Sequence, residues 1–231
     1  MKKIFLSVLN RIYLKIIGRD DQLKKDWANL DKYSMDNKKL SVPAMDEQRV
    51  VFMGDSITEY WKVMDGNFFA AKNYINRGIS GQTTPQMLVR FRPDVIELKP
   101  AVVVILAGVN DIAENTGPIT LEAIFGNIVS MAQLAKENGI VVVLSSVLPV
   151  NYFTRRPDLK PAEKVIELNT MIKGHCEKNK IEYIDYHSAM VDENKGLDKK
   201  YTDDGLHPTI AGYKIMGPLA ERAVKKTLDR L

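Results

Sequence analysis

The chain has 231 residues, 45% of them hydrophobic and 27% charged, a composition that fits one globular domain and excludes the collagenous and low-complexity classes. A net charge of +4 from 33 basic and 29 acidic residues is mild, and no block of like charges marks a nucleic-acid-binding arm, so we expect no nucleic-acid partner. The single cysteine, Cys176, excludes an internal disulfide and a cysteine-rich zinc site.

The N-terminal stretch Met1–Gly18 has apolar residues at helical spacing with a basic border, which predicts an amphipathic helix. We favour a helix packed on the domain, with a membrane-interface helix and a degenerate signal peptide as alternatives. The stretch is too short to span a bilayer, and the absence of a clear cleavage site slightly favours a cytoplasmic over a periplasmic or secreted location. We assign residues 1–48 to an N-terminal segment and residues 49–231 to the main domain.

From Arg49 onward, short apolar runs alternate with longer segments of helical period, which is typical of a parallel sheet with crossover helices. The predicted strands are Arg49–Met53, Asn73–Asn76, Ala101–Ala107, Ile140–Ser145 and Ile181–Asp185. The predicted helices are Thr84–Arg92, Leu121–Asn138, Ala162–Lys178 and Ile210–Leu231. Continuous runs such as AVVVILA suit strands that are buried on both faces. We therefore predict a three-layer α/β domain with five parallel strands.

Gly54-Asp55-Ser56 follows the first predicted strand, and a helical pattern begins at once. Ligands of open α/β sheets bind outside the carboxyl ends of the strands, so Ser56 is a candidate reactive hydroxyl. It is equally a candidate helix cap, because Ser56 and Glu59 have the S-x-x-E spacing of a capping box. The local sequence leaves both interpretations open.

A reactive serine needs a base, usually a histidine that a third group orients. His175 lies in a helical pattern, which predicts a surface or packing role. Asp185 and His187 form a possible pair after the fifth strand, although residues two apart on a strand point in opposite directions. We favour His207, because Asp204 precedes it by three residues and can accept from the imidazole within one turn. The alternative for Asp204 and His207 is a capped entry to the last helix.

Attack by a hydroxyl creates a negative oxygen that preorganised donors must stabilise. Three donors follow strand ends: the N–H of Ser56, the N–H of Gly81 and the uncharged side-chain amide of Asn110. Taken singly, Gly81 is explained by an ordinary turn and Asn110 by a helix cap. Taken together and in this order, the segments favour a nucleophile with its donors and its base.

These segments resemble the four sequence blocks of the SGNH, or GDSL, hydrolases. The blocks are Gly54-Asp55-Ser56, Gly81 in Gly-Ile-Ser-Gly-Gln-Thr, Gly108-x-Asn110-Asp111 and Asp204-x-x-His207. The resemblance runs from about Arg49 to the C-terminus and implies a flavodoxin-like fold with sheet order 2-1-3-4-5, no metal or cofactor, and ester hydrolysis through an acyl-serine. It implies Ser56 as nucleophile, His207 as base, Asp204 as its orienting partner, and Ser56, Gly81 and Asn110 as oxyanion donors.

Fold and triad do not fix the substrate. The sequence has no long hydrophobic insertion that could form a lid over a fatty chain, so we expect a small-molecule ester with a short acyl group, acetyl above all, on a carbohydrate or other polar alcohol. A lysophospholipid or thioester is the enzymatic alternative. A flavodoxin-like module that binds phosphate or nucleotide is the non-enzymatic one, although neither G-x-G-x-x-G nor a P-loop motif occurs. The oligomeric state is left open.

Overall fold

The computed structural model describes residues 26–44 and 46–231, so the predicted amphipathic segment Met1–Gly18 lies outside the described residues. One parallel sheet forms the centre of the domain, with the strand order β2-β1-β3-β4-β5. The strands are β1 (Val50–Gly54), β2 (Tyr74–Gly78), β3 (Val102–Ile105), β4 (Val141–Ser145) and β5 (Glu182–Ile184). The predicted fold class and the predicted order 2-1-3-4-5 are both confirmed.

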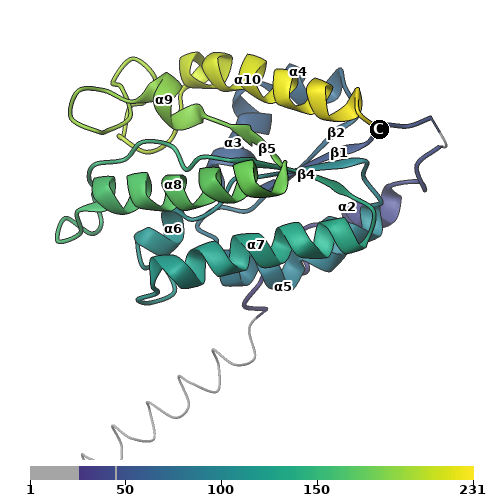
Figure 1. Ribbon diagram of the computed structural model, residues 1–231, viewed down its shortest axis with the longest axis horizontal. Coiled ribbons are helices and arrows are strands. Elements are labelled where there is room, and N and C mark those ends of the chain that lie inside the picture. The colour runs from purple at the N-terminus through teal and green to yellow at the C-terminus, as the bar shows by residue number, and fades with distance from the viewer. Residues whose placement is uncertain (1–25, 45) are drawn as a thin grey trace, which may run out of the picture.

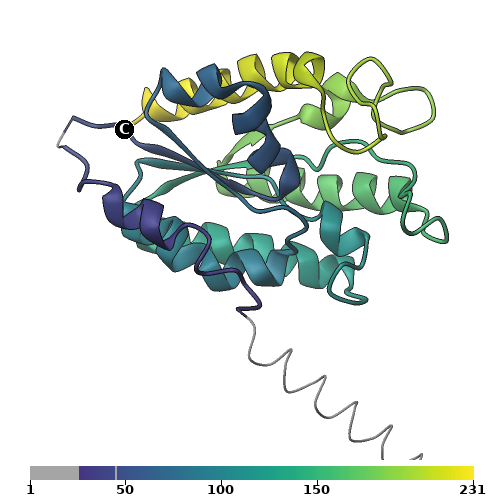
Figure 2. The same ribbon diagram turned by 180° about the vertical axis from the view of Figure 1, so that it is seen from behind.

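Helices cover both faces of the sheet, with α3, α4 and α10 on one side and α5, α7 and α8 on the other (Figures 1 and 2). Their bounds are α2 (Ser34–Lys39), α3 (Ser56–Met64), α4 (Gly66–Ala70), α5 (Thr84–Asp94), α6 (Val109–Ile112), α7 (Leu121–Glu137), α8 (Pro161–Asn179), α9 (Tyr186–Met190) and α10 (Ile210–Leu228), with a 3-10 turn η1 at Ile96–Leu98. The four long helices occur where the periodicity predicts them. Within the described ranges, no helix is both long enough and apolar enough to cross a bilayer.

The central strands are fully buried because helices pack against both of their faces. Every residue of β1 and β3 is buried, and Val50 pairs with Val102 at the start of their shared ladder. Runs of valine and isoleucine suit this position. Successive side chains point to opposite faces of the sheet, so both helical layers are met by apolar groups that need no hydrogen-bond partner. The core therefore lies on both sides of β1 and β3, directly beneath the loops that follow them.

The helix α3 packs unusually close to β2, and this contact depends on a glycine. A Cβ atom at Gly78 would lie 2.2 Å from the backbone nitrogen of Glu59, a distance that no real side chain tolerates. The close approach brings the first turn of α3 next to the loop that leaves β2. Two of the predicted site segments, around Ser56 and around Gly81, are neighbours for this reason.

Candidate active site

A chain of hydrogen bonds joins the predicted nucleophile to the predicted base at the carboxyl edge of the sheet. Ser56 Oγ lies 2.9 Å from His207 Nε2, although the two residues are 151 positions apart. His207 Nδ1 lies 2.6 Å from Asp204 Oδ2. The two ring nitrogens of His207 thus face a hydroxyl and a carboxylate, the arrangement that base-assisted attack by a serine requires.

Both oxygens of Asp204 are occupied by donors from its own turn. Asp204 Oδ1 accepts from the backbone N–H groups of Leu206 at 2.9 Å and His207 at 2.7 Å, while Oδ2 faces the imidazole. Partial burial opposes ionisation, but the hydrogen bonds from His207 and Leu206 lower the pKa of Asp204 to about 2. Asp204 is therefore a carboxylate near neutral pH.

The cap of α3 differs from the capping box that the spacing predicts. Asp55, not Ser56, is the N-cap residue, and its Oδ1 accepts from Ile57 N at 2.9 Å. Glu59 turns away from the helix start, because its Oε2 accepts from the backbone N–H of Ser80 at 2.7 Å and from the Ser80 hydroxyl at 2.5 Å. The capping-box interpretation of Ser56 is wrong. With Asp55 in the cap position, Ser56 lies in the first turn and its hydroxyl is available to His207.

The predicted donors Gly81 and Asn110 are linked through Asn115, a residue that no sequence motif marks. Gly81 has a φ of +76°, a left-handed conformation that favours glycine, in a turn closed by Gln82 N and Ile79 O at 3.3 Å. Asn115 Nδ2 donates both to Gly81 O at 3.1 Å and to Asn110 Oδ1 at 2.9 Å. The oxygen of the Asn110 amide is thereby engaged, which leaves its NH₂ group as the donor side.

Neither Asn110 nor Asp111 caps its own helix, because Gly108 is the N-cap of α6. The helix-cap alternative for Asn110 is therefore wrong. Asp111 instead accepts from the first residue of α5, Thr84, through its backbone N–H at 2.9 Å and its hydroxyl at 2.6 Å. Burial raises the pKa of Asp111 to about 6, against the opposing effect of these hydrogen bonds. This contact fastens the Asn110 segment to the start of α5.

The alternative pair Asp185 and His187 has different partners. Asp185 caps α9, where Ser188 donates to it through its N–H at 2.9 Å and its hydroxyl at 2.8 Å. The backbone N–H of His187 donates to Ser146 Oγ at 2.8 Å. The third histidine, His175, packs its ring edge-on against Phe125, with 5.7 Å between the ring centres. Among the hydrogen bonds of the described residues, only His207 joins an imidazole to Ser56.

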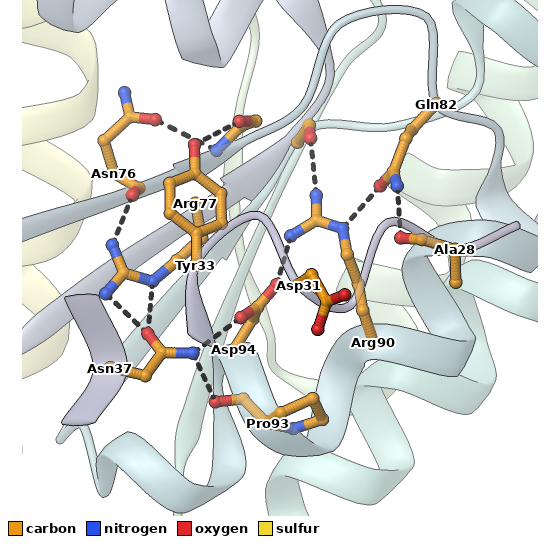
Figure 3. A network of polar contacts seen from close by, with 12 residues as sticks. Ala28, Asp31, Tyr33, Asn37, Asn76, Arg77, Gln82, Arg90, Pro93 and Asp94 are labelled. Atoms are coloured by element: carbon orange, nitrogen blue, oxygen red, sulfur yellow. Dashed lines mark hydrogen bonds and ion pairs between the residues drawn. The ribbon is translucent and has the colours of Figure 1, made fainter. Parts of the chain in front are cut away.

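A buried arginine links β1, which leads into Ser56, to the loop that carries Gly81. Arg90 Nη2 donates to Gly54 O at 2.9 Å, Nε donates to Gln82 Oε1, and Nη1 pairs with Asp94 Oδ2 at 3.0 Å (Figure 3). The side chain of Arg90 is 0% exposed, so these contacts replace all of its hydration. No motif in the sequence marks Arg90, and the Gly-Ile-Ser-Gly-Gln-Thr block contains Gln82 without indicating its contacts, because the partners of both residues are distant in the chain.

A cavity of about 230 Å³ opens beside His207, between α3 and the turn that carries Asp204. Its lining residues are Tyr60, Val63, Met64, Asp203, Asp204, His207, Pro208 and Thr209. The Tyr60 ring centre lies 5.3 Å from that of His207, and Val63 is 79% exposed. Within residues 26–44 and 46–231, no group of three or more His, Cys, Asp or Glu side chains could hold a metal ion.

Comparison with known proteins identifies the family. The model of the GDSL-like lipase/acylhydrolase family matches residues 52–215. A crystal structure of a proposed acylhydrolase from Bacteroides fragilis is 51% identical, with a TM-score of 0.88 over 89% of this chain and 100% of that one. A GDSL-like lipase from Bacteroides thetaiotaomicron is 50% identical, with a TM-score of 0.86 over 87% and 99%.

More distant relatives have lower sequence identity to this chain. The esterase TesA of Pseudomonas aeruginosa is 29% identical over 178 residues, which cover 71% of this chain and 81% of TesA. An acetylxylan esterase from Geobacillus stearothermophilus has the same fold, with 20% identity and a TM-score of 0.62 over 80% of this chain and 96% of that one. Because the family model covers well over half of the chain, from β1 into α10, this protein belongs to the GDSL-like lipase/acylhydrolase family and is an ester hydrolase of the SGNH type.

Proposed function

We propose that this protein hydrolyses carboxylic esters through an acyl intermediate on Ser56. The observation that carries the proposal is the chain from Ser56 Oγ through His207 to Asp204, with 2.9 and 2.6 Å between the atoms. In the first step Ser56 Oγ attacks the ester carbonyl while its proton passes to His207 Nε2. The ionised Asp204 holds the imidazole in the required tautomer and stabilises its positive charge.

The negative oxygen of the tetrahedral intermediate accepts from Ser56 N–H, Gly81 N–H and Asn110 Nδ2, each donor contributing about 3–4 kcal/mol to the barrier decrease. Collapse of this intermediate breaks the bond to the alcohol oxygen, which takes the proton from His207 Nε2. A water molecule then attacks the acyl-serine with His207 again as the base. Release of the acid regenerates Ser56 with its proton, so the cycle consumes one ester and one water.

We propose a short acyl group, acetyl above all, on a carbohydrate or other polar alcohol as the substrate. The alcohol oxygen must approach His207 Nε2 to receive its proton, so the alcohol lies on the side of the site that His207 occupies. The cavity on that side combines an aromatic wall from Tyr60 with polar groups from Asp203 and Thr209, a mixture typical of small-molecule sites. A sugar ring packed on Tyr60 has hydroxyl groups for these polar neighbours.

The second candidate is a longer acyl chain, as in a lysophospholipid or a thioester, and the apolar rim of the same cavity favours it. Val63 is 79% exposed and Met64 41% exposed, and both lie about two turns along α3 from Ser56. A panel of p-nitrophenyl acetate, butyrate and octanoate, with acetylated sugars and lysophosphatidylcholine, separates the candidates. We expect kcat/KM to fall as the acyl chain lengthens; a rise toward octanoate and the lysolipid would support the second candidate.

The chemical mechanism is tested with a serine-reactive fluorophosphonate and mass spectrometry of the intact protein. We expect one adduct per wild-type chain, no adduct in Ser56→Ala, and unchanged labelling in His187→Ala as the matched histidine control. Stoichiometric labelling would also exclude the interpretation as a non-catalytic binding module. Absence of labelling in folded wild-type protein would refute the serine mechanism.

A further inference from the structure

Part of the N-terminal segment lies against the loop that carries Gly81. We call residues 28–37 the strap and residues 78–83 the oxyanion loop. The strap lies outside residues 52–215, the range that the family model matches, so family membership alone assigns it no role. Figure 3 shows its residues Ala28, Tyr33 and Asn37 within one network of polar contacts that also contains Gln82 and Arg90.

The first contact fixes Ser80 of the oxyanion loop. Lys32 Nζ pairs with one oxygen of Glu59, and the other oxygen accepts from the N–H of Ser80 at 2.7 Å and from its hydroxyl. Burial opposes ionisation of Glu59, but the hydrogen bonds from Lys32 and Ser80 hold its pKa below the ordinary value. The carboxylate therefore fixes Ser80, and the peptide between Ser80 and Gly81 contains the N–H that we propose as an oxyanion donor.

The second contact holds the start of the loop. The Tyr33 hydroxyl donates to Gly78 O, and the Arg77 guanidinium lies 4.6 Å from the centre of the Tyr33 ring. Burial raises the pKa of Tyr33 to about 12, so the hydroxyl keeps its proton and remains a donor. Gly78 is the last residue of β2, and its carbonyl marks where the loop leaves the sheet.

The third contact fixes Gln82 of the oxyanion loop. Gln82 Nε2 donates to Ala28 O at 2.7 Å, and Gln82 Oε1 accepts from the buried Arg90. The backbone oxygen of Gln82 accepts from Asn110 Nδ2 at 3.1 Å. The strap thus fixes the side chain of the residue whose backbone fixes the Asn110 amide. Within the loop itself, the turn is closed only by the 3.3 Å hydrogen bond from Gln82 N to Ile79 O.

We propose that the strap is a positioning element of the oxyanion hole. It holds the Gly81 N–H and the Asn110 amide at their mutual spacing while touching no substrate. The inference rests on the proposed function, since it assumes that these two groups stabilise the oxyanion. Donors lower a barrier only when they are oriented before the charge develops. A loop held at Gly78, Ser80 and Gln82 meets that condition.

The test uses full-length variants that remove strap contacts without opening the core: Lys32→Met, Tyr33→Phe and the double variant. Lys39→Met is the matched control, because Lys39 lies just beyond the strap and its only loss is an exposed pair with Asp36, in which the side chains are 72% and 62% exposed. kcat and KM are measured with p-nitrophenyl acetate, and kcat is expressed per active site after complete fluorophosphonate titration. Thermal unfolding is followed in parallel.

We expect the double variant to lose about 10- to 100-fold in kcat, because displacement of oriented groups by less than an ångström has effects of this size. KM should change by less than about threefold, since ground-state binding is untouched. The control should stay within about twofold of the wild type, and Lys32→Arg should restore most of the kcat lost in Lys32→Met because it keeps the charge. Combined with Asn110→Ala, the double variant should lose less than the product of the separate losses, because both changes act on one group of donors.

An unchanged kcat per titrated site in the double variant overturns the inference, whatever happens to its melting temperature. A rise in KM at constant kcat also overturns it, because the strap would then act on substrate binding. If the fold-losses in kcat of the double variant and of Asn110→Ala multiply fully when the changes are combined, the strap acts elsewhere and the inference is overturned. Failure of the proposed function is recognised separately, by turnover that survives Ser56→Ala.

Discussion

Replacing Asp204 by asparagine tests the orientation of the base, because the contacts of this residue dictate how the amide must lie. Asp204 Oδ1 receives three donors, from Leu206 N at 2.9 Å, His207 N at 2.7 Å and Thr202 Oγ1 at 3.2 Å. The asparagine oxygen must take that position to satisfy them, so the NH₂ group faces His207 Nδ1 across the former 2.6 Å contact. His207 Nδ1 then accepts, and its proton moves to Nε2, where it points at Ser56 Oγ.

A base that already carries a proton toward the serine cannot remove the serine's own proton. We expect kcat of Asp204→Asn to fall by about 10³–10⁴-fold, the size that a wrong tautomer causes in serine hydrolases. The free energy of unfolding at neutral pH should fall by only about 1 kcal/mol, because the backbone donors keep an acceptor and the lost charge is half-exposed and screened by solvent. kcat per titrated site with p-nitrophenyl acetate and urea unfolding measure the two quantities, with His187→Ala as a control that keeps activity.

Asp204→Asn should also change how the free energy of unfolding depends on pH in acid. The folded-state pKa of Asp204 is about 2, below its ordinary value of 3.8, so this carboxylate stabilises the fold above about pH 4 and loses that contribution as the pH falls toward about 2. Asp204→Asn should lack this part of the acid destabilisation. Retention of more than about a tenth of the wild-type kcat in Asp204→Asn would refute the orientation argument.

Three further predictions concern the support of the site. Asn115→Asp removes the amide that donates to Gly81 O and Asn110 Oδ1, and we expect kcat with p-nitrophenyl acetate to fall about 10-fold or more at constant KM; an effect on KM alone would contradict this role. Burial raises the pKa of Asp55 from 3.8 to about 7, so its contribution to stability is complete below about pH 4 and is lost as the pH rises to about 7. Urea unfolding of Asp55→Asn should therefore show a flatter dependence on pH in this window, and an unchanged slope would be evidence against it. Gly78→Ala would place a Cβ 2.2 Å from a backbone nitrogen of α3 and should destabilise the fold by about 3 kcal/mol or more, whereas Gly81→Ala, whose nearest neighbour is 3.8 Å away, should cost only about 1–2 kcal/mol for its left-handed φ; equal losses in urea unfolding would contradict the difference.

Features that depend on local periodicity could be predicted from the sequence. The five apolar runs gave the sheet, because strands buried on both faces need continuous apolar residues, and the long helices followed from their 3.6-residue spacing. The helices α6 and α9 were missed because four or five residues contain too little of that period. The contact between Asp204 and His207 was predictable because both residues belong to one turn.

Contacts between residues that are distant in the chain could not be predicted in this way, because they produce no pattern in the sequence. The S-x-x-E spacing of Ser56 and Glu59 predicted a capping box, but Asp55 competes for the cap position and Glu59 binds the oxyanion loop instead. Arg90 reaches Gly54 across 36 positions, and Gln82 reaches Ala28 across 54. A glutamine in a turn or an arginine in a helical pattern is normally a surface residue, so nothing in one sequence distinguishes these two from solvated neighbours.

The buried guanidinium of Arg90 connects the segment of Ser56 to the oxyanion loop. One nitrogen holds the carbonyl that precedes Asp55 and Ser56, and another holds the side chain of Gln82 in the oxyanion loop. If either segment detached, a charge with 0% exposure would lose a neutral acceptor, at a cost typical of a hydrogen bond to a buried charge, about 1.5–3 kcal/mol. We therefore expect activity and tertiary structure to disappear in a single transition as urea is raised. The segment of Ser56 and the oxyanion loop should therefore unfold together.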